Sequence, residues 1–144
     1  MPKNLMFATC TVLLILAACG PAPKEADRDD TAPGQTGAPV ESSRGKLIIH
    51  MADDMAFSPE RAVINAGDTV VWIQDGALPH TTSDGPGLAA VPDNSLLAEG
   101  AAPWDSGLLD SGESFTLVFD APGEYTYLCT IHEAAGMVGH ITVR

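Results

Sequence analysis

The chain has 144 residues, and its charge is strongly one-sided, since 7 Lys and Arg stand against 19 Asp and Glu, for a formal net charge of −12. A surface this acidic repels a phosphate backbone, so nucleic acid is an unfavourable partner, whereas a basic protein would be attracted. High net charge also keeps a protein soluble, and net charge alone does not separate these two roles.

Residues 1–18 have the features of a signal peptide of the lipoprotein type. One basic residue, Lys3, precedes an apolar run from Leu5 to Ala18 that is shorter than the ~20 residues a membrane-spanning helix needs. The run ends in Leu16-Ala-Ala-Cys19, which resembles a bacterial lipobox. This resemblance implies cleavage before Cys19, lipidation of Cys19, and a membrane-anchored lipoprotein that faces the periplasm or the cell surface. An ordinary signal peptide with an incidental cysteine is the alternative.

Residues 19–45 are predicted to be a disordered linker carrying this lipid anchor. After the cysteine, Pro, Gly, Ala and charged residues dominate, and no aromatic residue occurs. Such a composition buries too little apolar surface to offset the entropy lost on ordering. A flexible chain of this length has an r.m.s. span of ~25–30 Å, which would let a small domain reorient above a bilayer.

The three cysteines agree with a location outside the cytoplasm. Cys10 lies in the predicted signal peptide and Cys19 is the predicted lipid site, so Cys129 is left in the mature chain without a disulfide partner. A single thiol in an oxidising compartment is open to damage unless it is protected or used. Metal ligation would do both.

Residues 46–144 are predicted to form one domain built of short strands. The expected strands are Leu47–Met51, Arg61–Asn65, Thr69–Gln74, Ser114–Phe119, Glu124–Cys129 and Val138–Val143. Apolar residues in 114–119 alternate as Phe115, Leu117 and Phe119, which predicts one inward face. Many short strands separated by Gly and Pro turns predict an all-β sandwich of about seven to eight strands.

Residues 84–103 are an insertion without a clear element. Gly85-Pro-Gly87 and the later prolines exclude a long regular segment, although Leu88–Val91 and Ser95–Glu99 fit short helical turns. Two roles remain open, a flap that contacts a partner or a packed segment that covers the core. The packed segment is the favoured interpretation.

The segment from Cys129 to Met137 concentrates metal-binding side chains. Cys129, His132 and Met137 bring a thiolate, an imidazole and a thioether together between two expected strands. Two imidazoles and a thiolate with a long axial methionine are the signature of a blue-copper electron-transfer site. The loop supplies one histidine, and His80, just after an apolar strand, is favoured as the other. Taken singly these residues are more often core residues, but their joint order favours copper.

The pattern resembles the cupredoxins from Lys46 to Arg144. Further matching landmarks are Phe57–Pro59, Ala66–Val70, Trp104–Gly107, Gly123–Cys129 and Gly136–Gly139. The Cys-x₂-His-x₄-Met loop is similar in length to those of plastocyanin and pseudoazurin. The resemblance implies a Greek-key β-sandwich that binds one type 1 copper ion. It implies a monomeric one-electron carrier between redox partners outside the cytoplasm, and not an enzyme. The implied ligands are His80, Cys129, His132 and Met137.

The resemblance also implies roles for residues around these ligands. The edge of His132 would be the electron port, inside an apolar docking patch made of Leu78, Pro79, Ile131, Ala134 and Ala135. Thr81, where plastocyanins often have Asn, would hydrogen bond beside the site. Leu128 stands where plant plastocyanins have a Tyr that serves a second electron route, which argues against that route and against a photosynthetic role.

The remaining histidines are not expected to bind the metal, since His50 is interpreted as structural and His140 as solvated. A copper storage or delivery protein is the alternative function, because it would use the same ligand types. Such proteins tend to carry Met-rich or His-rich tracts, and this chain has four His and five Met in all. A copper enzyme would need additional histidine sets and further domains.

Overall fold

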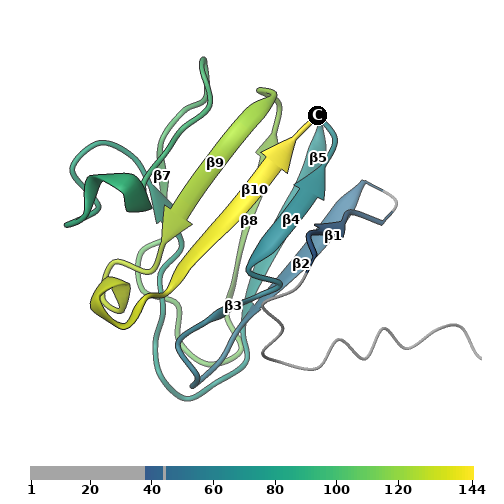
Figure 1. Ribbon diagram of the computed structural model, residues 1–144. Helices are drawn as coiled ribbons and strands as arrows, with labels where there is room; N and C mark the ends of the chain where they lie inside the picture. The colour runs from purple at the N-terminus through teal and green to yellow at the C-terminus, as the bar shows by residue number, and fades with distance from the viewer. Residues whose placement is uncertain (1–37, 44) are drawn as a thin grey trace, which may run out of the picture. The chain divides into compact units, whose positions relative to one another are not determined.

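A computed structural model describes residues 38–43 and 45–144. These residues form ten β-strands and two single-turn 3₁₀-helices, arranged in two sheets (Figure 1). The predicted signal peptide, the predicted lipid site Cys19 and most of the predicted linker lie outside the described residues. Within the described ranges, neither helical segment has the length and apolar character needed to cross a bilayer.

The first sheet has six strands in the order β1-β4-β10-β9-β6-β7. Their bounds are Val40–Glu41 for β1, Arg61–Ile64 for β4, Val138–Val143 for β10, Gly123–Leu128 for β9, Ser83–Asp84 for β6 and Trp104–Asp105 for β7. Strand β10 pairs antiparallel with β9 and parallel with β4. Both ends of the loop that joins β9 to β10 are therefore attached to hydrogen-bonded strands in the middle of this sheet.

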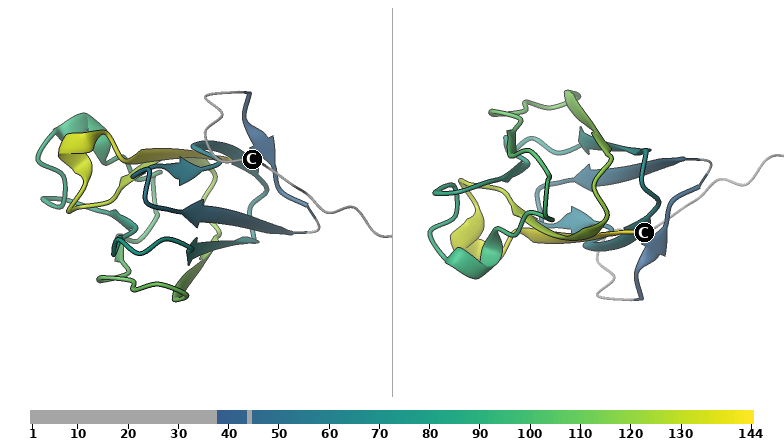
Figure 2. Two further views of the ribbon diagram at one scale, coloured as in Figure 1. Left: turned by 90° about the horizontal axis from the view of Figure 1, so that it is seen from below. Right: turned by 90° about the horizontal axis from the view of Figure 1, so that it is seen from above.

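The second sheet has four strands in the order β3-β2-β5-β8. Their bounds are Phe57–Ser58 for β3, Lys46–Met51 for β2, Asp68–Gln74 for β5 and Ser114–Phe119 for β8. Strands β2 and β5 are parallel, and the other pairs are antiparallel. Side chains of β2 alternate between exposed and buried, so one face of this sheet turns towards the first sheet (Figure 2).

An aromatic core fills the space between the sheets. Trp72 of β5 is fully buried, and its ring centroid lies 6.2 Å from that of Trp104, 6.2 Å from Phe119 and 5.5 Å from Tyr127. Tilted and edge-on contacts of this kind stabilise a core beyond simple burial. The two sheets are thus fixed against each other close to the end of β9, where Tyr127 lies two residues before Cys129.

The six longer strands match the expected segments to within one residue at each end. Phe115, Leu117 and Phe119 are also the more buried positions of β8, as their alternation predicted. The strand number exceeds the predicted seven to eight because β1, β3, β6 and β7 have only two residues each. Two residues are too few for an alternating pattern to be recognised in a sequence.

Part of the predicted linker, which ends at residue 45, belongs to the first sheet. Val40–Glu41 form β1, which pairs parallel with β4. The Ser42 amide donates to the Val63 carbonyl at 3.0 Å, and the Ser42 hydroxyl donates to the Asp68 carboxylate. The polar, Pro- and Gly-rich composition around this strand explains why it was not predicted from the sequence. Residues 40–43 therefore belong to the folded sandwich.

The insertion packs against the first sheet, as the favoured interpretation of residues 84–103 expected. Backbone hydrogen bonds of 2.9 Å join Leu96 and Thr126 in both directions, and Ala98 is buried in the core. The helical turn η1 is Pro92–Asn94, which lies between the two stretches predicted to be helical, so that placement was wrong. The proline at the first helical position explains why the turn begins there.

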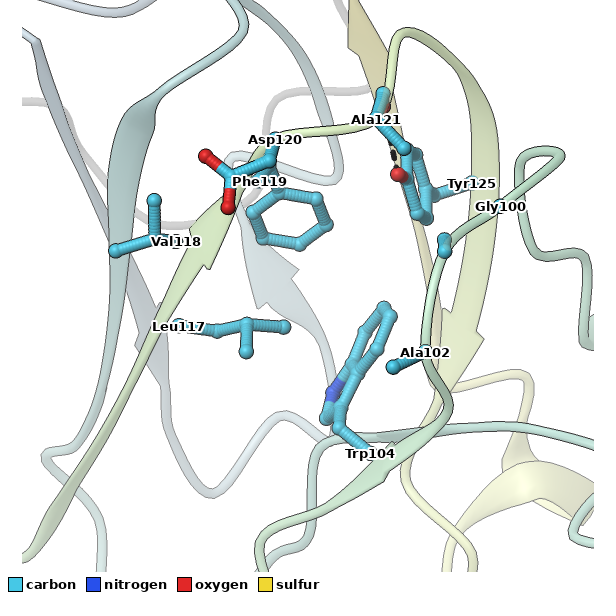
Figure 3. A pocket seen from close by; sticks show the side chains of 10 residues that line it. Gly100, Ala102, Trp104, Leu117, Val118, Phe119, Asp120, Ala121 and Tyr125 are labelled. Carbon is cyan, nitrogen blue, oxygen red and sulfur yellow. Dashed lines mark hydrogen bonds between the residues drawn. The ribbon is translucent and has the colours of Figure 1, made fainter.

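A pocket of about 250 Å³ lies on the side of the sandwich where β8 approaches the segment before β7 (Figure 3). Trp104, Phe119 and Tyr125 contribute aromatic walls. The Tyr125 hydroxyl is occupied, since it donates to the Ala121 carbonyl at 2.7 Å. None of the predicted copper ligands lines this pocket, so it is separate from the candidate metal site.

Candidate metal centre

Three of the predicted ligands come together at one end of the strands. Donor atoms of His80, Cys129 and His132 all lie within 4.8 Å of one another. Nδ1 of His80 is 3.0 Å from Nδ1 of His132 and 3.8 Å from the Cys129 sulfur, and that sulfur is 3.5 Å from Nδ1 of His132. Both rings therefore turn the same nitrogen, Nδ1, towards the thiol.

The loop between β9 and β10 brings its ligands together by folding back on itself. The His132 amide donates to the Cys129 carbonyl at 3.0 Å, and the Cys129 amide donates to the Met137 carbonyl at 3.0 Å. The helical turn η2, Glu133–Ala135, ends at Gly136, whose φ of 86° is a left-handed conformation that glycine adopts without strain. This closure places Cys129 beside Met137 in the backbone.

His80 reaches the site from the segment that follows β5. Its Nε2 lies 2.9 Å from the Ala52 carbonyl, which only accepts, so Nε2 carries the proton and Nδ1 presents its lone pair to the cluster. Backbone hydrogen bonds of 3.2 and 2.8 Å with Leu109 hold the residue in place. Burial lowers the pKa of His80, which favours the neutral imidazole that binds metals.

Asp53 fixes the turn that leads to His80, a role that sequence reasoning missed. Its Oδ1 accepts the amide of Ala77 at 2.7 Å and that of Leu78 at 2.9 Å. These two bonds lower the pKa of Asp53. The Gln74 side chain donates to the Leu78 carbonyl from the end of β5. The approach to the ligand is thus supported on both sides.

Thr81 contacts Cys129, one of the candidate ligands. Its amide donates to the Cys129 sulfur at 3.3 Å. Its hydroxyl accepts the Thr130 amide at 2.8 Å and lies 3.1 Å from the Thr130 hydroxyl. The residues directly after His80 and Cys129 are therefore joined to each other.

Met137 is fully buried at the end of the loop. Its amide lies 3.3 Å from the His132 carbonyl, to which it donates, and its carbonyl binds the Cys129 amide. The backbone of Met137 is thus tied to both loop ligands.

The other two histidines lie outside this cluster. His50 is exposed and its ring pairs with the Asp75 carboxylate on the surface. His140 is half-buried in β10, where burial lowers its pKa and Nδ1 lies 3.2 Å from the Thr126 hydroxyl. His140 is therefore less solvated than expected from its sequence position.

Apolar side chains are exposed on the same loops as the ligands. His80 and Cys129 are fully buried, whereas His132 is half-buried and is the one of these three candidate ligands that reaches solvent. Of the predicted docking patch, Pro79 is half-buried, and the exposed members are Leu78, Ile131, Ala134 and Ala135. Sequence reasoning missed Leu108, which is 59% exposed and precedes the residue bonded to His80.

The donor set fits copper. A thiolate and two neutral imidazoles are ligands that copper sites of the blue type use in a trigonal plane. Bonds of about 2.0–2.3 Å to a central first-row ion separate three such ligands by about 3.5–4 Å, close to the arrangement here. No large rearrangement of the described residues is required to surround one ion.

Comparison with known families decides the relationship. A family model described as copper binding proteins, plastocyanin/azurin family, matches residues 45–144. The chain belongs to the plastocyanin/azurin family. Copper is therefore the cofactor of this cupredoxin, as the sequence predicted, and His80, Cys129 and His132 are positioned as its candidate site.

Similar proteins include two plastocyanins. That of Tetradesmus obliquus is 36% identical over 94 residues, which cover 62% of this chain and 59% of the relative. That of Nostoc punctiforme is 36% identical over 93 residues, with 62% and 66% covered. The chain thus covers less than two thirds of the length of either plastocyanin.

Solved structures of amicyanin variants have the same fold. A reduced variant is 25% identical, with a TM-score of 0.55 and coverage of 72% of this chain and 86% of amicyanin. An oxidized variant is 24% identical, with a TM-score of 0.55 and the same coverage. These likenesses, together with the two sheets, confirm the predicted cupredoxin β-sandwich.

Proposed function

We propose that this cupredoxin is a type 1 blue copper protein that carries single electrons between redox partners outside the cytoplasm. The observation that carries the proposal is the convergence of one thiol and two Nδ1 atoms within 4.8 Å. Bound copper would supply the one-electron couple. His80, Cys129 and His132 would hold it in a plane, and Met137 would be the weak axial ligand.

The surroundings of the ligands support electron transfer because they restrict ligand motion. His80 is fixed through Ala52, and the Thr81 amide is directed at the Cys129 sulfur. A site whose ligands barely move on oxidation and reduction loses little energy to reorganisation at each transfer. The hydrogen bonds around the ligands would serve this purpose, as such outer contacts do in other metal sites.

The exposed edge of His132 is the proposed electron port. Small and branched apolar residues around it, including Leu78, Ile131 and Leu108, suit the small, weak and rapidly dissociating interfaces of redox encounters. Within the described part of the chain, the bases are Lys46, Arg61 and Arg144. The acidic residues, which outnumber these bases, would attract a basic redox partner towards the protein.

The proposed carrier acts as a monomer without enzyme activity and is held at a membrane through Cys19. The anchor rests on the sequence pattern alone. Copper storage is the less favoured function, because His80, Cys129 and His132 form a single cluster of this kind in the described part of the chain. A storage protein would be served better by several ion sites.

The test is a redox titration of the purified, copper-loaded full-length protein, followed in the visible spectrum. The oxidised protein should be intensely blue because Cys129 would supply a thiolate to the copper, and the colour should vanish and return with one electron per chain. Cys129→Ala should abolish the band, whereas Cys10→Ala should leave it intact. A colourless Cu(II) form, or a colour that does not cycle, would refute the electron carrier.

A further inference from the structure

Glu133, the residue directly after His132, ties the ligand loop to the insertion. Its Oε2 accepts the Ala90 amide at 2.8 Å, and its Oε1 accepts the Val91 amide at 2.9 Å and the Asn94 side-chain amide at 2.9 Å. The turns η1 and η2 are therefore neighbours, joined by the hydrogen bond from Asn94 to Glu133. Both carboxylate oxygens are therefore engaged by the insertion.

We propose that Glu133 is a positioning residue that fixes His132 at the copper site by clamping the ligand loop to residues 85–95, here called the strap. The proposal rests on the proposed copper site for its effect on the metal. The clamp itself is a property of the protein, so it can be measured separately from copper chemistry.

The strap is a firm support because its two ends are joined to each other and to the first sheet. The Ser95 hydroxyl donates to Asp84 of β6 at 2.6 Å, and Ser95 Oγ accepts the Gly85 amide at 3.1 Å. The next residue, Leu96, is paired with Thr126 of β9 through two backbone hydrogen bonds. A carboxylate bound to this strap is thus bound to the sandwich.

The ligand loop needs such a support on its outer side. The half before His132 is held by the Thr81–Thr130 contact. In the half after it, Ala134, Ala135 and Gly136 are exposed. Apart from the Val138 amide at the start of β10, which donates to the Gly136 carbonyl, the hydrogen bonds that residues 133–136 make outside the loop, within the described chain, are those of Glu133. Without them, the backbone next to His132 would be held only by its own turn.

The three bonds are of the strong kind, because the acceptor is ionised. Their engagement also lowers the pKa of Glu133, in keeping with a carboxylate that accepts several N–H groups. Losing one such bond should raise the frequency with which the loop opens about tenfold. Faster opening at His132 should in turn speed the loss of copper.

The test compares Glu133→Gln and Asn94→Asp in the full-length protein. The first removes the carboxylate, and the second places a repelling carboxylate against it. The double variant restores an amide–carboxylate pair with the roles exchanged. Glu99→Gln is the matched control, because Glu99 is an exposed acid on the same insertion and its loss changes net charge by the same amount.

Two measurements are made on each variant. Amide hydrogen exchange at Ala90 and Val91 in the reduced, copper-loaded protein reports on the clamp, and the rate of copper transfer to a chelator reports on the site. Each single variant should raise both rates about tenfold, the amount expected for one charge-assisted bond. The double variant should recover part of this change, and Glu99→Gln should leave both rates unaltered.

Unchanged exchange in Glu133→Gln would overturn the clamp. Faster exchange with unchanged copper loss would overturn the positioning role and leave Glu133 as a purely structural contact. A wild-type protein that is not blue would refute the proposed function, and with it any role of Glu133 at copper. Exchange at Ala90 and Val91 would still show whether the clamp exists, so the two failures are distinguishable.

Discussion

Thr81 and Thr130 join the two segments that carry His80 and Cys129. The Thr130 amide donates to the Thr81 hydroxyl oxygen at 2.8 Å, and the two hydroxyl oxygens are 3.1 Å apart. Each threonine directly follows a candidate ligand. The bridge therefore sets the separation of an imidazole from a thiol that is 49 residues away in the chain.

Thr81→Val should weaken both the fold and the copper site. Valine keeps the shape of threonine but leaves the Thr130 amide without its acceptor, which should lower the free energy of unfolding by about 1–3 kcal/mol. Chemical denaturation of the copper-free protein measures this change. Transfer of copper to a chelator should also become faster, because the spacing of His80 and Cys129 is less restricted.

Thr116→Val is the matched control for this change. Thr116 is exposed on β8 and belongs to the sheet that does not carry Cys129. Its replacement should alter the free energy of unfolding by no more than about 0.5 kcal/mol. Equal losses in Thr81→Val and Thr116→Val would show that the bridge contributes nothing specific.

Met137→Leu and His80→Ala should separate an axial ligand from an equatorial one. Met137→Leu should keep the blue band, because the three other proposed ligands would remain, and should raise the reduction potential, since losing a weak donor would disfavour Cu(II) more than Cu(I). His80→Ala should weaken copper binding or change the spectrum, because one of the proposed strong ligands would be lost. Visible spectra and potentiometry check both outcomes.

His50→Ala is the control for the choice of histidine. The His50 ring is exposed and pairs with Asp75 on the surface, away from the cluster. Spectrum and potential should stay nearly unchanged. Loss of the blue site in His50→Ala, with His80→Ala silent, would overturn the proposed ligand set.

The long strands and the ligand order could be predicted because both are local features of the sequence. Alternation in 114–119 marks a buried face, and Cys129, His132 and Met137 lie on one loop. The short strands β6 and β7 could not be predicted in this way. They exist because Ser83 pairs with Leu128 and Asp105, contacts that depend on the assembled sandwich.

The supports of the site were also beyond sequence reasoning. Asp53 binds the amides of Ala77 and Leu78, which are 24 and 25 residues away, and Glu133 binds amides on the insertion 42 and 43 residues away. The local sequence around an acidic residue in a polar segment does not identify such a distant partner. The pairing arises from the way the loops meet, and only the structure reveals it.

Cys19→Ser tests the membrane anchor, which lies outside the described residues. If Cys19 is lipidated, the wild-type protein should fractionate with membranes and partition into detergent, because acyl chains bind the bilayer. The variant should be released or left unprocessed, since serine lacks the thiol that accepts lipid. Wholly soluble wild-type protein with an unmodified N-terminus would refute the lipoprotein.

Asp84 should make stability depend on pH. It is fully buried in β6, where Oδ1 accepts the Ser95 hydroxyl at 2.6 Å and Oδ2 has no hydrogen-bond partner among the described residues. Burial raises the pKa of Asp84 to about 6 from 3.8. The folded protein thus binds this proton more tightly than the unfolded chain. The resulting stabilisation is complete below pH 3.8 and is lost as the pH rises through about 6.

Asp84→Asn should remove this dependence, because an amide keeps the hydrogen bond to Ser95 and carries no charge. The difference in free energy of unfolding between the variant and the wild type should shift in favour of the variant by up to about 3 kcal/mol from acid to neutral pH. This shift is the equivalent of about two pKa units. Denaturation of the copper-free full-length proteins across this pH range measures the difference, and subtraction cancels the other titrating groups. Asp93→Asn, on the exposed turn η1, should show no such difference. Parallel curves for the wild type and Asp84→Asn would mean that the Asp84 carboxylate has found a partner in solution and is not buried alone.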